Sequence, residues 1–140
     1  MTINTDSLIR CIHTLEEAFT QLQKFEVGHS FYDIFQAASV KEFELVLEQS
    51  GRLLRKRLHP FFASNRQVDH LTFKDAFRHA VRHDLISAAA CERWFAYREH
   101  RNDTAHEYGE RFAEATLELL PDFISDAKEL AHIIAEGRDD

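Results

Sequence analysis

The 140-residue sequence has few of the residues that interrupt regular structure. It contains only 4 Gly and 2 Pro, a shortage that leaves few turns and favours long helices. Cys11 and Cys91 are its only cysteines, too few for a disulfide framework, which favours a reducing compartment. No stretch approaches about 18 consecutive apolar residues, so no membrane span is expected. The N-terminus lacks a basic segment followed by an apolar run, and we therefore expect no signal peptide and a cytoplasmic protein.

Apolar residues make up 44% of the sequence, and they recur at helical spacing in five segments. The last segment contains Pro121, which predicts a kink or two helices in series. No strand pattern, internal repeat or interdomain linker is present. The sequence predicts an all-α fold: an antiparallel, up-down bundle of about five helices in one domain, residues 1–140. The predicted helices are 6–25, 31–62, 73–83, 88–102 and 110–135, and residues 63–72 are predicted to be a loop.

The net charge of -7 is unevenly distributed along the chain. Residues 52–101 contain 11 Lys/Arg and 5 Asp/Glu, a net charge of +6, whereas the remaining residues carry -13. A basic middle segment is consistent with a surface that binds polyanions. A set of solvated helix faces is the alternative. His79 and His83 lie four residues apart on one helical face, but no third ligand accompanies them, so no metal site is predicted.

The stretch RNDTAHEY, residues 101–108, interrupts the apolar pattern. In an unbroken helix Arg101 and His106 would point about 140° apart. Thr104 and Glu107, however, match a capping box that opens a new helix. A turn there would let Arg101 and His106 face one cleft. The alternative is a surface ion pair between Arg101 and Asp103, with His106 acting only as a helix cap.

The residue types in this stretch suit phosphate chemistry without a metal. A histidine titrates near neutral pH and can exchange a proton with a hydroxyl or a leaving group. An arginine has a permanent charge and a planar fork that matches phosphate oxygens. An asparagine has both a donor and an acceptor for orientation. Arg101, Asn102 and His106 are therefore candidate site residues.

The segment REHRNDTAHEY, residues 98–108, resembles the R-N-x-x-x-H-x-Y signature of the HEPN superfamily. It is similar in particular to the nucleotidyltransferase substrate-binding proteins, and its Arg-x4-His-x-Tyr spacing is that of the HepT-type toxins. The segments FKDAFRHAVRHDLI, RWFAYREHRN and VKEFELVLEQSGRLLRKRL also resemble this family. The resemblance extends over roughly residues 5–135 and implies a HEPN-like helical bundle.

The resemblance also implies roles for individual residues. Arg101 and His106 would form a metal-independent ribonuclease site, with Arg101 stabilising charge on the phosphate and His106 acting as general acid or base. Asn102 and Arg98 would bind the substrate. Tyr108 matches the tyrosine that a partner nucleotidyltransferase adenylates to silence such toxins. No cofactor is implied.

The resemblance implies two kinds of partner and leaves two functions open. The chain is expected to form a homodimer, with the motifs of its two protomers close together, and to pair with a minimal nucleotidyltransferase as antitoxin. In the first function it is a toxin-like ribonuclease that acts on RNA. In the second it is a non-catalytic subunit that presents a substrate to the nucleotidyltransferase, and the same residues hold a phosphate or nucleotide.

Overall fold

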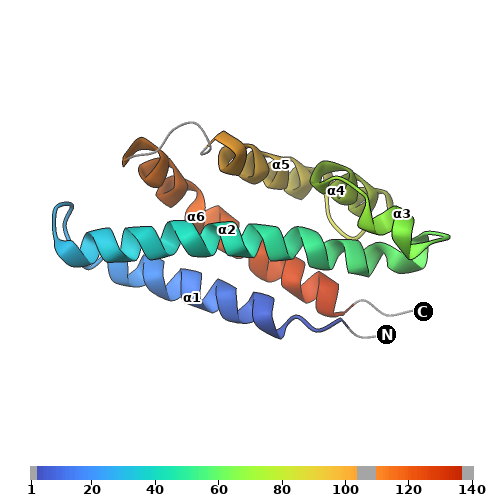
Figure 1. The fold of residues 1–140 in the computed structure, drawn as a ribbon, viewed down its shortest axis with the longest axis horizontal. Helices are drawn as coiled ribbons and strands as arrows, with labels where there is room; N and C mark the ends of the chain where they lie inside the picture. The colour runs from blue at the N-terminus through green and yellow to red at the C-terminus, as the bar shows by residue number, and fades with distance from the viewer. Residues whose placement is uncertain (1–2, 104–109, 137–140) are drawn as a thin grey trace.

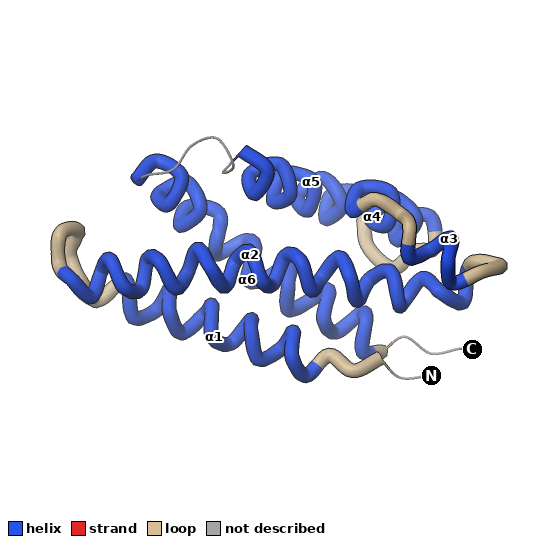
Figure 2. The backbone as a smooth tube through the Cα atoms, viewed as in Figure 1, coloured by secondary structure: helices blue, strands red, loops and turns tan. Residues whose placement is uncertain are grey.

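The computed structural model describes residues 3–103 and 110–136, and this part of the chain is helical without any strand (Figures 1 and 2). A 3₁₀ turn, His59–Phe61, follows the second helix. The all-α prediction is confirmed, with six α-helices among the described residues against about five predicted. The helices are α1 (Asp6–Leu22), α2 (Ser30–Leu58), α3 (Asn65–Asp69), α4 (Phe73–Arg82), α5 (Ala88–Asp103) and α6 (Glu110–Ala135).

Helix α2 is the longest element, and the other helices pack around it. Helices α1 and α6 contact α2 and each other, and α4 and α5 also pack on α2. Figure 1 shows that α1 begins and α6 ends at the same end of the bundle. Within the described residues, no helix combines the length and the apolarity that crossing a membrane requires.

Side-chain caps fix where several helices begin. The hydroxyl of Thr72 accepts a hydrogen bond from the Asp75 amide at 3.1 Å, as expected for an N-cap at the start of α4. Ser64 accepts from the Gln67 amide at 3.2 Å and opens α3. The prediction of an uninterrupted loop over residues 63–72 is therefore wrong. The added helix buries Val68 completely, a contact that local sequence did not reveal.

Proline acts differently at its two positions. Pro60 lies in the 3₁₀ turn, so α2 ends at Leu58, four residues before its predicted end. Pro121 lies within α6, which continues as one helix on both sides of it. The alternative of two helices in series is thus wrong, although a proline cannot donate the hydrogen bond that its position in the helix would otherwise make.

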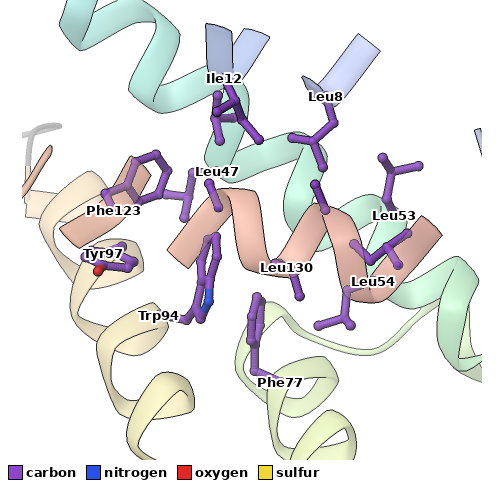
Figure 3. Close-up of a cluster of buried hydrophobic side chains, with 14 of the residues drawn as sticks. Leu8, Ile12, Leu47, Leu53, Leu54, Phe77, Trp94, Tyr97, Phe123 and Leu130 are labelled. Carbon is purple, nitrogen blue, oxygen red and sulfur yellow. The ribbon is translucent and has the colours of Figure 1, made fainter. Parts of the chain in front are cut away.

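Aromatic side chains from four helices join the bundle in one core (Figure 3). Phe43 of α2 meets Phe123 of α6 edge to face, with ring centroids 4.7 Å apart. Trp94 of α5 lies between Phe123 and Phe77 of α4, at 5.6 and 5.1 Å. Such arrangements are favourable for aromatic rings beyond the apolar area they bury. They fix α5 against α6 and α2, and so define where the end of α5 lies.

A polar network also holds α5 against α6. Asp126 accepts two hydrogen bonds from Arg93, at 2.8 and 2.9 Å, and a third from the Tyr97 hydroxyl at 2.5 Å. Burial, followed by this hydrogen bond to Asp126, raises the pKa of Tyr97 well above its usual value. The phenol therefore remains a donor throughout the physiological pH range.

Candidate functional site

The C-terminal end of α5 carries three of the predicted site residues. Arg98 and Arg101 are three positions apart, so they lie on neighbouring positions of one helical face. Both are partly exposed, and Asn102 is exposed. The structure therefore places both guanidinium groups on the same side of α5, where the charges can act on one elongated ligand.

The C-terminal end of α5 lies close to the N-terminal part of α6, and the two helices run in opposite senses (Figure 1). Nε2 of His100 lies 2.7 Å from Oγ1 of Thr116 in α6. In one continuous helix, the 16 intervening steps would separate these residues by about 24 Å. The short contact therefore shows that α5 and α6 do not form one continuous helix, whereas the capping box of Thr104 and Glu107 stays a prediction. The capping box itself lies in residues 104–109, outside the described part of the chain.

His100 is a site-forming residue that the sequence did not single out. The Thr116 hydroxyl donates to the Phe112 carbonyl oxygen at 2.9 Å, so its oxygen accepts the N–H at Nε2 of His100. The imidazole also stacks on Phe112, with centroids 4.5 Å apart and planes 16° apart, and meets Phe43 edge-on. His100 thus fixes the end of α5 against the start of α6 and against α2. Its position next to Arg101 is the only sequence signal for this role.

Glu44 of α2 is the second residue that local sequence could not identify. Its Oε2 lies 3.8 Å from Nε of Arg101, and the two side chains are 28% and 38% exposed. A contact of this length between partly solvated groups is weak. A phosphate that approaches Arg101 can therefore compete with Glu44 for the guanidinium at small cost.

Arg98 is held by an aromatic ring. Its guanidinium carbon lies 5.4 Å from the centroid of Phe73, the first residue of α4. Stacking on the ring limits the orientations of the side chain and leaves the N–H groups at its edge available to an acceptor. The predicted substrate-binding role of Arg98 is thus compatible with its surroundings.

His106 and Tyr108, the predicted general acid or base and the predicted modification site, lie outside the described residues. The geometry between Arg101 and His106 is therefore not part of the site that the structure defines. What it does define is a pair of arginines at the end of α5, and a contact of His100 that joins this end to α6. In the described segments, no cluster of three or more His, Cys, Asp or Glu side chains is arranged to hold a metal ion.

The fold and the site together define a class of protein: an α-helical bundle that presents two arginines at the C-terminal end of its fifth helix. The family model described as "Nucleotidyltransferase substrate binding protein like" matches residues 4–136. The chain belongs to this family, and the resemblance inferred from residues 98–108 is confirmed.

One known protein and two solved structures are among those similar to this chain. A "Probable ribonuclease HepT" of Haemophilus influenzae is 29% identical over 126 residues, which cover 87% of this chain and 85% of that protein. A solved H. influenzae structure, described as having the fold of a substrate binding domain of a nucleotidyltransferase, is 27% identical with a TM-score of 0.81 and covers 94% and 98% of the two chains. A tri-AMPylated Shewanella oneidensis HEPN toxin, solved in complex with an MNT antitoxin, shares the fold at 15% identity, with a TM-score of 0.65 and the same coverage.

Proposed function

We propose that this protein is the toxin of a nucleotidyltransferase/HEPN toxin–antitoxin pair and acts as a metal-independent ribonuclease. The observation that carries the proposal is that Arg98 and Arg101 lie on one side of the C-terminal end of α5, directly before the segment whose sequence contains His106. The similarity of most of the chain to a probable ribonuclease HepT supports the same function.

The proposed reaction is an internal transfer of the phosphate. His106 removes the proton of the ribose 2'-hydroxyl, and the 2'-oxygen attacks the adjacent phosphorus. The bond from phosphorus to the 5'-oxygen breaks, and that oxygen takes up a proton, which leaves a 2',3'-cyclic phosphate and a 5'-hydroxyl. Arg101 stabilises the charge on the phosphate oxygens during this transfer, and Asn102 orients the group.

The nucleotidyltransferase partner would neutralise the toxin by adenylating Tyr108. Tyr108 follows His106 by two residues, so the added nucleotide would stand beside the catalytic pair. Its negative phosphate would repel the phosphates of RNA, and its bulk would block their entry. Modification of a HEPN toxin found with an MNT antitoxin supports a mechanism of this kind.

A cleavage assay in EDTA tests the nuclease. Single-stranded RNA is incubated with the wild-type protein, with Arg101→Ala and with His106→Ala, and His132→Ala serves as a control on the exposed face of α6. We expect metal-free cleavage that falls by about 10²–10⁴-fold in His106→Ala and is retained in the control. Equal cleavage by His106→Ala and the wild type would contradict the mechanism.

Mass spectrometry tests the modification separately. The protein is incubated with the nucleotidyltransferase and ATP, and the peptide that contains Tyr108 is analysed. Adenylated Tyr108, together with loss of cleavage, is the expected result. If Tyr108 is unmodified and another residue carries the nucleotide, Tyr108 is not the modification site.

The second candidate is a non-catalytic subunit that presents a substrate to the nucleotidyltransferase. The family description favours it, as does the description of the H. influenzae structure. In this case Arg101 and Asn102 hold a phosphate or nucleotide without cleaving RNA. Absence of RNA cleavage at any protein concentration, with nucleotide binding that Arg101→Ala weakens, would select this function.

We also propose that the chain forms a homodimer through α1 and α2. These helices line an open groove of about 640 Å³ whose apolar walls include Ile9, Ile34 and Phe35. Ile34 is 56% exposed, and Phe31, near the start of α2, is 49% exposed. Neighbouring exposed apolar side chains are typical of an association surface.

A further inference from the structure

Arg55 of α2 and Arg98 of α5 form a second cationic cluster beside the motif. Nε of Arg55 donates to the Leu71 carbonyl oxygen at 2.9 Å, which fixes the guanidinium against the connection between α3 and α4. This hydrogen bond uses one of five N–H donors and leaves those of the two terminal nitrogens. Arg55 is partly buried, so its position is defined by packing as well as by this bond.

Phe73 and Gly51 bring the two arginines together. A Cβ at Gly51 would stand 2.9 Å from Cδ2 of Phe73 and 3.7 Å from Nη1 of Arg55. The absence of a side chain at Gly51 therefore lets the Phe73 ring rest directly on α2, next to Arg55. Arg98 lies over the same ring at 5.4 Å, so the Phe73 ring that rests against α2 at Gly51, beside Arg55, also holds the guanidinium of Arg98.

Among the described residues, no carboxylate lies within ion-pair distance, 4.0 Å, of either arginine. The acidic groups nearby are paired elsewhere: Asp69 with His59 at 2.9 Å, and Glu99 with Lys74 at 2.8 Å. Burial and, after it, the repulsive charge of Arg98 lower the pKa of Arg55, and the charge of Asp69 offsets only part of this lowering. An anion placed between them would relieve this repulsion.

The cluster continues the line of positive charge that begins at the motif. Arg98 and Arg101 are separated by about 4.5 Å along the axis of α5. Arg55 extends the line from Arg98 toward the connection between α3 and α4. A single-stranded RNA carries phosphates at regular intervals, whereas a single phosphate at Arg101 would leave the other two arginines unused.

We propose that Arg55 and Arg98 form a second phosphate subsite, which binds a backbone phosphate of single-stranded RNA next to the one held by Arg101. The proposal rests on the proposed function, because it assumes that the substrate is RNA. The guanidinium forks bind the phosphate oxygens, and Phe73 and Gly51 position the forks. The subsite is a binding element that selects longer strands and takes no part in bond cleavage.

The test compares ligands that contain one phosphate with ligands that contain many. Binding is measured with 2'-O-methyl RNA, in which the attacking hydroxyl is blocked. One probe is a dinucleoside monophosphate, and the other is an oligonucleotide of about ten residues, a usual length for single-strand sites. The variant is Arg98→Gln. Arg82→Gln is the matched control, because Arg82 lies nine positions after Phe73 in α4 and points about 180° away from it.

We expect Arg98→Gln to lower the ratio of long-strand to dinucleoside affinity roughly tenfold, as loss of a charged hydrogen bond predicts. The slope of log affinity against log salt for the long strand should fall by about 0.7. Arg82→Gln should leave this ratio unchanged. Arg55→Gln should act in the same direction as Arg98→Gln. Because Arg55 also donates a hydrogen bond to the Leu71 carbonyl oxygen, the melting temperature of the Arg55→Gln variant is measured. If this variant unfolds, the result for Arg98→Gln alone decides whether the subsite exists.

An unchanged affinity ratio in Arg98→Gln would overturn the subsite, even if the protein cleaves RNA. So would weaker binding to the nucleotidyltransferase with unaltered RNA binding, because the arginines would then serve a protein partner. If Arg98→Gln lowers the affinity ratio but the wild type does not cleave RNA, the phosphate subsite is supported and the proposed nuclease activity is rejected. Absence of RNA binding by the wild type would reject both.

Discussion

His100 donates a hydrogen bond from Nε2 to Oγ1 of Thr116 over 2.7 Å, and this contact joins the end of α5 to α6. In the sequence, the two residues lie on either side of the segment that contains His106. Thr116 is completely buried, so the acceptor has no access to water. The contact therefore contributes to stability, and it also fixes the end of α5 relative to α6.

Removal of this contact should lower the stability of the folded protein. We expect Thr116→Val, which is close in shape but lacks the hydroxyl, to reduce the free energy of unfolding by about 1–3 kcal/mol, because the His100 N–H loses its acceptor. Urea denaturation measures the change. A double-mutant cycle with His100→Ala should give a coupling energy clearly different from zero. Additive effects of the two substitutions would show that the pair does not act as a unit.

Substitution of Glu44 should strengthen the interaction with RNA. Glu44→Gln removes a carboxylate 3.8 Å from Arg101, together with its repulsion of phosphate. Partly exposed ion pairs contribute about 0.2–1 kcal/mol, so an affinity increase of up to about fivefold is expected. Glu92→Gln is the matched control, since Glu92 is exposed on α5 nine positions before Arg101, on the opposite side of the helix. Weaker RNA binding by Glu44→Gln would show that the carboxylate positions Arg101.

A charged residue in the α1–α2 groove should prevent dimerisation. Ile34→Lys places an ammonium group in the proposed apolar interface, and burying it there is unfavourable. Light scattering should show a dimer for the wild type and a 16.4 kDa monomer for the variant. Phe61→Lys is the control, because Phe61 is also exposed, at 41%, but lies after the opposite end of α2. A wild-type monomer at all concentrations would contradict the homodimer.

Loss of the carboxylate at position 126 should loosen the packing of α5 on α6. In Asp126→Asn, the bidentate contact with Arg93 and the contact with Tyr97 lose their charged acceptor. Because Arg93 is 46% exposed, solvent screens part of this interaction, and we expect a loss of about 1–3 kcal/mol. Chemical denaturation measures it. Asp122→Asn, at an exposed position one turn earlier in α6, should change stability little.

The two cysteines should differ in reactivity. Cys91 is 5% exposed, and burial raises the pKa of its thiol, so little reactive thiolate is present near neutral pH. Cys11 is partly exposed, and its sulfur accepts a hydrogen bond from Gln49 at 3.2 Å. A thiol reagent should therefore modify Cys11 in the folded protein and Cys91 only on unfolding. Cys11→Ser should abolish the early phase, and modification of Cys91 under native conditions would contradict the assignment.

The periodic apolar residues predicted the helices because burial of one face repeats every 3.6 residues. Leu8, Ile12 and Leu15 illustrate this in α1, where all three are buried. The prediction was wrong for α3, whose five residues are too few for a periodic signal and depend on burial of Val68. It was also wrong about the end of α2, because the geometry of Pro60 in a short 3₁₀ turn depends on local backbone packing.

The sequence by itself determined the helical class and the resemblance carried by Arg101, Asn102, His106 and Tyr108, because these follow from residue type and spacing along the chain. Only the tertiary structure decided which side chains surround the arginines. Glu44, Phe73 and Arg55 come from other helices, and His100 meets Thr116 across a chain reversal. Contacts between residues far apart in sequence arise from packing, so no local pattern could have specified them.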